Sequence, residues 1–299
     1  MPHPVFELAI VGSDRIAEHE AAIRKKPYLH LSTRIGESSP ERIPNSGTFG
    51  DFDFNSAGIG AVVVSTPASE RDYWALQSAR ANKPVLVDGP LAGSSAGLLE
   101  LRRLDQCMGE QVLMASTVLA SDIAADLLAA RGQIGRCLYM DLHMSIPRET
   151  LPSTRSGVAS LGATELLLLS ERFAGPLDSV HARSRSLLTN RPSEDALWAM
   201  LRFVNGVEGV LQVRGLDSTE RATITVHGTE GTLKLSTSLS RQTGEIRDRQ
   251  YENLVQVLTG HGKPACGVRD IHRCLFLDTW LEQSARQDRE LFSFDVRVE

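Results

Sequence analysis

The sequence contains few cysteines, and their spacing is unlike that of a metal site or a redox motif. Four occur in 299 residues, namely Cys107, Cys137, Cys266 and Cys274. None belongs to a Cys-x-x-Cys pair or to a zinc-type pattern. We therefore interpret them as reduced thiols of a cytoplasmic protein and expect no bound metal.

Blocks of like charge and long hydrophobic runs are also missing. The formal net charge is −5, and no dense Lys/Arg stretch offers an electrostatic footprint for nucleic acid or for an acidic membrane. No apolar run approaches the ~20 residues that span a bilayer. The N-terminus lacks a basic region followed by an apolar one. We therefore expect neither a nucleic-acid partner nor a membrane.

What is present is the composition of an ordinary globular protein. With 41% hydrophobic and 23% charged residues, the 299-residue chain is long enough for two domains of common size. Apolar runs and helical patterns alternate over 61–66, 70–81, 84–88, 94–108 and 111–116. This alternation predicts a Rossmann domain over 1–118, with a doubly wound parallel sheet.

The first strand and turn predict a dinucleotide-binding βαβ unit. The apolar run 7–11 ends at Gly12 and passes into a helical pattern that begins near Arg15 and Ile16. Gly12 supplies the tight turn, and the dipole of the helix favours a phosphate at its start. Asp14 stands at the second glycine position, where its charge opposes the diphosphate. We therefore expect NAD or NADP binding here to be weakened or lost.

An acidic residue about 20 positions after such a turn commonly contacts the ribose hydroxyls of NAD. Glu37 lies at about that position. It is either a ribose ligand or a solvated loop residue. Arg34 and Arg42 lie close to Glu37 in the sequence and could bind a 2′-phosphate, so the choice between NAD and NADP stays open.

From Ser121 onward the pattern changes to that of an α+β domain, predicted over 119–299. Helical patterns cover 121–130, 164–173, 251–258 and 269–289. Strand patterns cover 137–146, 179–187, 196–203, 209–214 and 222–227, with a hairpin turn at Asn205-Gly206. These strands predict an open, mainly antiparallel sheet.

An open antiparallel sheet leaves one face uncovered after helices cover the other. The alternating residues of 196–203 and 209–214 would supply that face. We therefore expect a homo-oligomer with closed symmetry, assembled through this sheet.

Several short motifs resemble those of the glucose-fructose oxidoreductase, inositol dehydrogenase and MocA (Gfo/Idh/MocA) family. They are 12–17 with His19, Thr66-Pro67, 84–92, Ile134-Gly135 and 227–233. The resemblance spans nearly the whole chain. It implies NAD or NADP in the first domain, a small polar substrate such as a sugar or cyclitol, and catalysis by a lysine and a histidine with a nearby aspartate.

The catalytic positions of the family are replaced in this chain. Asp88-Gly89-Pro90 corresponds to the family's Glu-Lys-Pro, so glycine stands for the lysine. In the general-base segment Leu161 stands for an aspartate, Glu165 for the histidine and Leu168 for a second aspartate. Glycine and leucine can neither accept a proton nor stabilise an oxyanion.

Two functions stay open at this point. One is a diverged dehydrogenase that uses Gly12, Glu37 and the Thr66-Pro67 turn for its cofactor and recruits Asp88 or Glu165 as acid or base. The alternative for Glu165 is a helix glutamate that faces a polar cleft or forms a salt bridge. The other function is a non-catalytic ligand-binding or scaffold protein on the same fold.

Overall fold

The computed structural model describes residues 5–12, 15–36, 54, 58–89, 91, 95–148, 163–188, 194–239 and 243–296. The chain forms two compact units. The first is built from 1–116 and 244–272, and the second from 117–243 and 273–298. The sequence alone placed 244–272 in the second domain, whereas its contacts group it with the first.

The first unit contains a parallel sheet with strand order β2-β1-β3-β4-β5, which confirms the predicted doubly wound sheet. The β3 run is rich in valine and is buried almost throughout, as expected for a strand covered on both faces. The strands, in sheet order, are β2 (Leu29–Ile35), β1 (Phe6–Val11), β3 (Ile59–Val64), β4 (Val85–Val87) and β5 (Val112–Met114).

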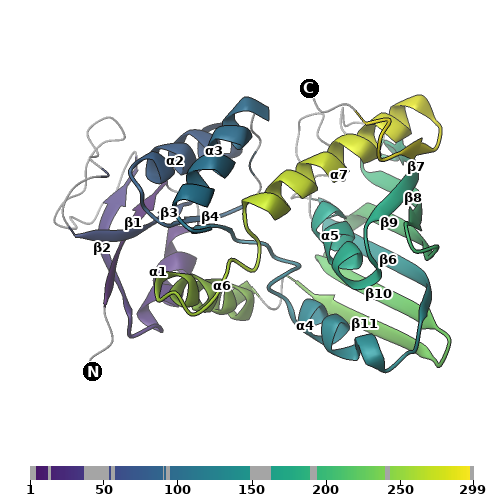
Figure 1. Ribbon diagram of the computed structural model, residues 1–299, viewed down its shortest axis with the longest axis horizontal. Helices are drawn as coiled ribbons and strands as arrows, with labels where there is room; N and C mark the ends of the chain where they lie inside the picture. The colour runs from purple at the N-terminus through teal and green to yellow at the C-terminus, as the bar shows by residue number, and fades with distance from the viewer. Residues whose placement is uncertain are drawn as a thin grey trace. The chain divides into compact units, whose positions relative to one another are not determined.

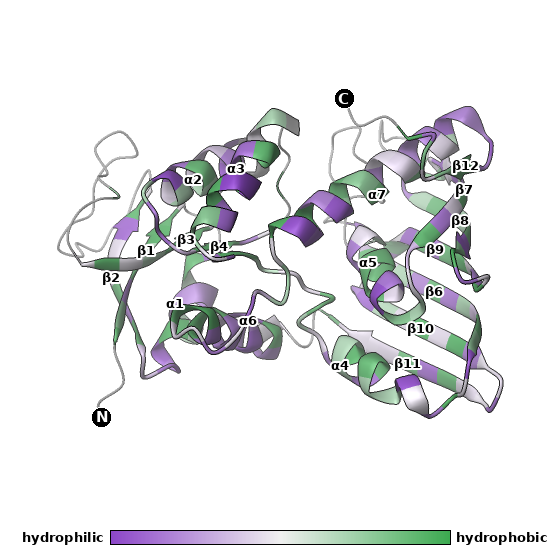
Figure 2. Ribbon diagram, in the orientation of Figure 1, coloured by the Kyte–Doolittle hydropathy of each residue, from purple (hydrophilic) through white to green (hydrophobic). Residues whose placement is uncertain are grey.

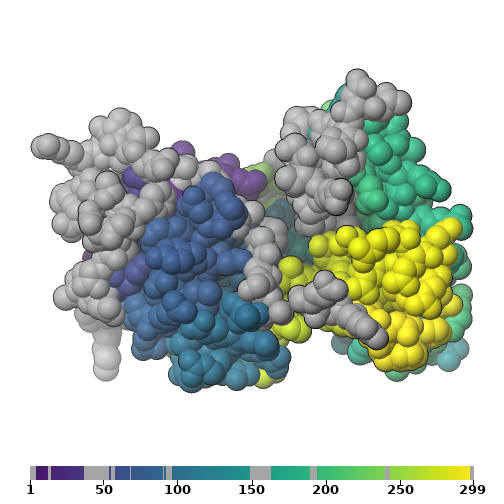
Figure 3. Space-filling model, turned by 90° about the horizontal axis from the view of Figure 1, so that it is seen from above, coloured from purple at the N-terminus to yellow at the C-terminus, as the bar shows by residue number. Residues whose placement is uncertain are grey.

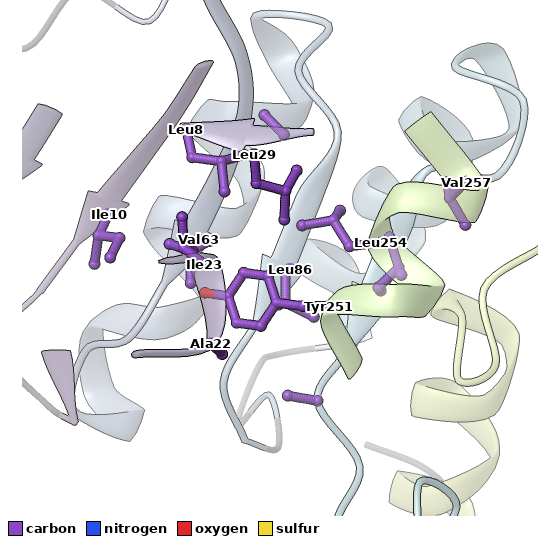
Figure 4. Close-up of a cluster of buried hydrophobic side chains, with 13 residues drawn as sticks. Leu8, Ile10, Ala22, Ile23, Leu29, Val63, Leu86, Tyr251, Leu254 and Val257 are labelled. Carbon is purple, nitrogen blue, oxygen red and sulfur yellow. The ribbon is translucent and has the colours of Figure 1, made fainter. Parts of the chain in front are cut away.

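Helices lie on both faces of this sheet (Figure 1). α2 (Ala68–Arg80) and α3 (Ser95–Cys107) cover one face, and their atoms form part of the surface in Figure 3. α1 (Ile16–Arg24) and α6 (Thr243–Leu258) cover the other. The core beneath α1 and α6 joins residues from both ends of the chain, including Leu8, Ile23, Leu86 and Tyr251 (Figure 4).

The turn after β1 explains why residue 12 is glycine. Its φ of 118° lies in the region that favours glycine, and a Cβ there would come within 1.9 Å of the Ser65 carbonyl oxygen. Its N–H donates to the Ile35 carbonyl oxygen at 2.7 Å. Gly12 therefore packs the first turn directly against the end of β3.

The second unit contains a sheet of order β11-β10-β6-β9-β8-β7-β12. β6 and β9 pair in parallel, and the other neighbouring pairs in the described residues are antiparallel, as predicted. The strands, in sheet order, are β11 (Thr232–Ser238), β10 (Arg221–Gly228), β6 (Cys137–Pro147), β9 (Glu208–Asp217), β8 (Ala196–Phe203), β7 (Leu177–Arg185) and β12 (Leu291–Phe292).

Alternation of buried and accessible residues gives this sheet one covered face and one open face. Figure 2 shows the alternation as bands of hydrophobic and hydrophilic residues along β6, β9 and β10. The predicted hairpin turn at Asn205-Gly206 joins β8 to β9, and Gly206 has a φ of 82°. The helices of this unit are α4 (Asp122–Ala129), the short η1 (Ala130–Gly132), α5 (Ala163–Ala174) and most of α7 (Val268–Gln287).

Every helix within the described ranges is too short or too polar to cross a lipid bilayer.

Candidate functional site

The carboxyl ends of three neighbouring strands form the candidate site in the first unit. Val11 of β1 pairs with Val64 of β3, which pairs with Val87 of β4. The residues that follow, Gly12, Ser65 and Asp88, therefore lie at the same edge of the sheet. The strand order reverses between β1 and β3, and this is where open α/β sheets bind their ligands.

The structure thus brings several of the predicted residues to one edge. Gly12 follows β1, Thr66-Pro67 leads from β3 into α2, and Asp88 follows β4. Arg15 precedes α1 with a φ of 49°, and Ile16 is the first helical residue. Asp14 and Glu37 lie outside the described residues, so their assignments stay predictions.

Asp88 is buried, and both of its carboxylate oxygens accept hydrogen bonds. Arg247 of α6 donates to Oδ1 at 2.9 Å and to Oδ2 at 3.2 Å. His19 of α1 places Nε2 3.0 Å from Oδ2, and the Ser65 hydroxyl donates to the same oxygen at 3.3 Å. The carboxylate therefore forms a bidentate ion pair with Arg247 and is also hydrogen-bonded to a histidine and a serine.

Charge and hydrogen bonding together affect the pKa of the Asp88 carboxyl more than burial does. Burial on its own would raise the pKa of Asp88, but the His19 hydrogen bond and the positive charge of Arg247 hold that pKa well below its usual range. The negative charge of Asp88 in turn raises the pKa of Arg247 against the effect of burial. Both groups are charged at neutral pH, and a carboxylate with a lowered pKa is a weak base.

A second layer of contacts fixes the partners of Asp88. The Tyr251 hydroxyl lies 2.9 Å from Nδ1 of His19, and both side chains are fully buried. His19 directs Nε2 at the Asp88 carboxylate, which can only accept, so Nε2 carries the proton of that hydrogen bond. Burial raises the pKa of Tyr251, so its hydroxyl keeps its proton. Figure 4 shows the Tyr251 ring reaching from α6 into the core under the sheet.

Neighbouring residues of α6 extend the same network. Arg247 also donates to Gln250 at 3.2 Å and to Glu18 of α1 at 3.4 Å. Gln250 donates to the Ser116 carbonyl oxygen at 3.1 Å, just beyond β5. We call Asp88, His19, Arg247 and Tyr251 the Asp88 cluster. It ties α1, β4 and α6 together at the edge where a ligand would bind.

Glu165, the other predicted acid or base, lies in the second unit in the first turn of α5. It is half-buried, and its Oε2 accepts the backbone N–H of Val118 at 2.9 Å. This contact fits the structural interpretation, while the catalytic assignment stays a prediction. Leu161 lies outside the described residues.

Sequence reasoning did not assign roles to His19, Arg247 or Tyr251. His19 shares the buried face of α1 with Ala22 and Ile23, at helical spacing. Arg247 and Tyr251 are four residues apart on the buried face of α6. A polar side chain on an otherwise apolar helix face is the available signal, but it does not identify the partner 159 residues away in sequence.

Comparison with known proteins supports the expected family. Residues 124–234 match the GFO/IDH/MocA C-terminal domain. No match was found among curated proteins. Solved structures match over nearly the full length of both chains but at low sequence identity, so they show the fold alone.

Three of these structures illustrate the identities and coverages of the matches. Myo-inositol dehydrogenase from Corynebacterium glutamicum is 14% identical, with a TM-score of 0.83, and the match covers 96% of this chain and 98% of that one. WlbA dehydrogenase from Bordetella pertussis, in complex with NADH and UDP-GlcNAcA, is 19% identical, with a TM-score of 0.81 and coverages of 98% and 99%. An oxidoreductase from Agrobacterium radiobacter, in complex with NAD+, L-tartaric acid and magnesium, is 15% identical, with a TM-score of 0.82 and coverages of 97% and 98%.

Replacing Arg247 with methionine tests the Asp88 cluster. We expect Arg247→Met to lower the free energy of unfolding by about 3–5 kcal/mol, because it leaves the Asp88 carboxylate buried without its counter-charge. The double variant Asp88→Asn with Arg247→Met removes both charges and should recover part of this loss. Denaturant unfolding measures both.

Arg80→Met is the matched control. Arg80 pairs with Glu100, but 48% of its side chain is exposed, so we expect a loss of at most about 1 kcal/mol. Equal losses for Arg247→Met and Arg80→Met would contradict a dominant role for the buried pair.

Proposed function

We propose that this chain belongs to the Gfo/Idh/MocA family, whose C-terminal domain its residues 124–234 match, and that it binds NAD or NADP at the strand edge of its first unit. The observation that carries the proposal is the first turn. Gly12 packs so closely on the end of β3 that any side chain would collide with the Ser65 carbonyl oxygen, and a tight glycine turn after the first strand is the feature that dinucleotide-binding units place against the diphosphate. The start of α1 follows directly and favours a phosphate.

We assign the cofactor contacts to the residues that the sequence indicated. They are Gly12, Arg15, Ile16, Thr66, Pro67 and Asp88, together with Asp14 and Glu37 outside the described part. Asp88 contributes by fixing the end of β4 through Arg247 and His19. The two neighbours solved with NADH and with NAD+ support a nicotinamide cofactor.

The substrate that we propose is a small polar molecule of the sugar or cyclitol type. The neighbours named for myo-inositol, or solved with UDP-GlcNAcA or L-tartaric acid, support this class. We further propose that turnover is weak or lost, because Gly89, Leu161 and Glu165 replace the residues that the family uses. Of the two candidate carboxylates, Glu165 is the better base, since Asp88 is held by an arginine.

Calorimetric titration with NAD, NADH, NADP and NADPH tests the proposal. We expect at least one dinucleotide to bind, and we expect Asp14→Gly to tighten that binding severalfold. One like-charge pair at ~4 Å costs about 1 kcal/mol in water and up to about 4 at an effective dielectric constant of about 20.

Two variants separate charge from backbone effects. Asp14→Asn should retain most of the gain, whereas Asp126→Asn, which removes an exposed charge of α4 in the second unit, should change nothing. If the unmodified protein binds none of the four dinucleotides, the proposal is wrong, and the alternative of a non-catalytic protein with another ligand stands.

The open face of the second-unit sheet supports a homo-oligomer. Met200 of β8 is 65% exposed and lies opposite Val210 of β9, with Trp198 on the same face. Arg202 lies opposite Glu208 beside this apolar centre. This face carries an apolar centre with one positive and one negative side chain beside it. It is therefore complementary to a second copy of itself, related by a two-fold axis.

Met200→Asp should convert the protein from an oligomer to a monomer in light scattering at micromolar concentration. Leu128→Asp is the matched control, because Leu128 is an apolar residue of α4 that is 41% exposed outside the sheet. An unmodified protein that is already monomeric at this concentration would disprove the interface.

A further inference from the structure

The space beside Gly89 is filled by an arginine of a neighbouring helix. Gly89 has a φ of 106°, and a Cβ built on it would lie 2.9 Å from Nη1, 3.1 Å from Cζ and 3.3 Å from Nη2 of Arg71. The guanidinium group therefore occupies the position that any side chain at residue 89 would enter.

The backbone of the preceding turn helps to hold this guanidinium. Arg71 lies in the first turn of α2, and its Nη2 donates to the Thr66 carbonyl oxygen at 2.9 Å. The residue as a whole is half-buried, and its Nε is buried. Arg71 thus presents a positive charge where β3 and β4 end, beside Asp88 and Gly89.

The topology determines which part of a dinucleotide would lie there. In this fold the ribose next to the adenine lies at the end of the second strand, and the diphosphate lies at the turn after the first. The sheet order β2-β1-β3-β4 then places the nicotinamide half beyond β1, over the ends of β3 and β4. Arg71 spans the ends of β3 and β4, which lie one and two strand spacings from β1, or about 5 and 10 Å, so its guanidinium lies on the nicotinamide side of the diphosphate turn.

From these observations we infer that Arg71 contacts the nicotinamide-ribose half of the bound dinucleotide and replaces, from α2, the side chain that position 89 lacks. The inference rests on the proposed function. The guanidinium donors suit the hydroxyl oxygens of the ribose and the carboxamide oxygen of the nicotinamide. Gly89 is part of the same arrangement, because only a residue without a side chain leaves the guanidinium its place.

Binding of two probes, NADH and ADP, tests the role of Arg71. ADP has the adenosine and the diphosphate but lacks the nicotinamide riboside. We expect Arg71→Met to weaken NADH binding about tenfold, as for the loss of one hydrogen bond to a charged group, and to change ADP binding less than twofold. Arg71→Lys keeps the charge and should give an intermediate affinity for NADH.

Two further variants guard against a purely structural effect. Gly89→Ala adds a methyl group that displaces the guanidinium and also strains a backbone with a φ of 106°, so it should weaken NADH binding more than ADP binding if the guanidinium acts on the nicotinamide half. Arg80→Met removes an arginine from the last turn of the same helix and should leave both affinities unchanged.

The outcomes separate this inference from the function on which it rests. If the unmodified protein binds no dinucleotide, the proposed function fails and the inference fails with it. If it binds NADH and Arg71→Met leaves that affinity unchanged, or weakens NADH and ADP equally, only the role of Arg71 is overturned.

Discussion

The ion pair between Asp88 and Arg247 is the interaction on which the first unit depends most. Both side chains are almost fully buried, at 7% and 5% exposed. Removing two charges from water is costly, and a buried pair seldom adds net stability over an apolar pair of the same size. We infer that its main effect is on specificity, because a position of α6 on the sheet that separated Arg247 from Asp88 would leave two buried charges without partners.

This constraint bears directly on the candidate site. A carboxylate at the end of β4 would be a natural acid or base in a dehydrogenase, but here Arg247, His19 and Ser65 all bind it. Asp88 therefore positions the strand end. Arg71, on a different element, brings a positive charge to the same edge. A lysine restored at residue 89 would need both a left-handed backbone and the space that Arg71 fills.

The sequence predicted the architecture well because the architecture follows from local patterns. The valine run of β3 and the Asn205-Gly206 turn are each legible within ten residues. The start of α6 was missed because its first turns are polar and begin eight residues before Tyr251, where the apolar pattern starts. The Asp88 cluster was missed for a related reason. Its partners come together only in the folded unit, and no spacing in the sequence links Asp88 to Arg247.

The pH dependence of unfolding tests the Asp88 pair most directly. The folded pKa of Asp88 lies below its ordinary value of 3.8, so the stabilisation is complete above about pH 4 and is lost as the pH falls further. In that acid range the unfolded chain binds a proton that the folded protein does not, which costs up to about 1.4 kcal/mol per pH unit. The free energy of unfolding should be measured from pH 6 to pH 2.5 for the unmodified protein and for Asp88→Asn. We predict that the free energy of unfolding of the unmodified protein exceeds that of Asp88→Asn by a constant amount above about pH 4, and that this difference shrinks below it. A difference that stays constant down to the lowest pH, or that shrinks only as the pH rises, would contradict a buried, charged Asp88 held by Arg247.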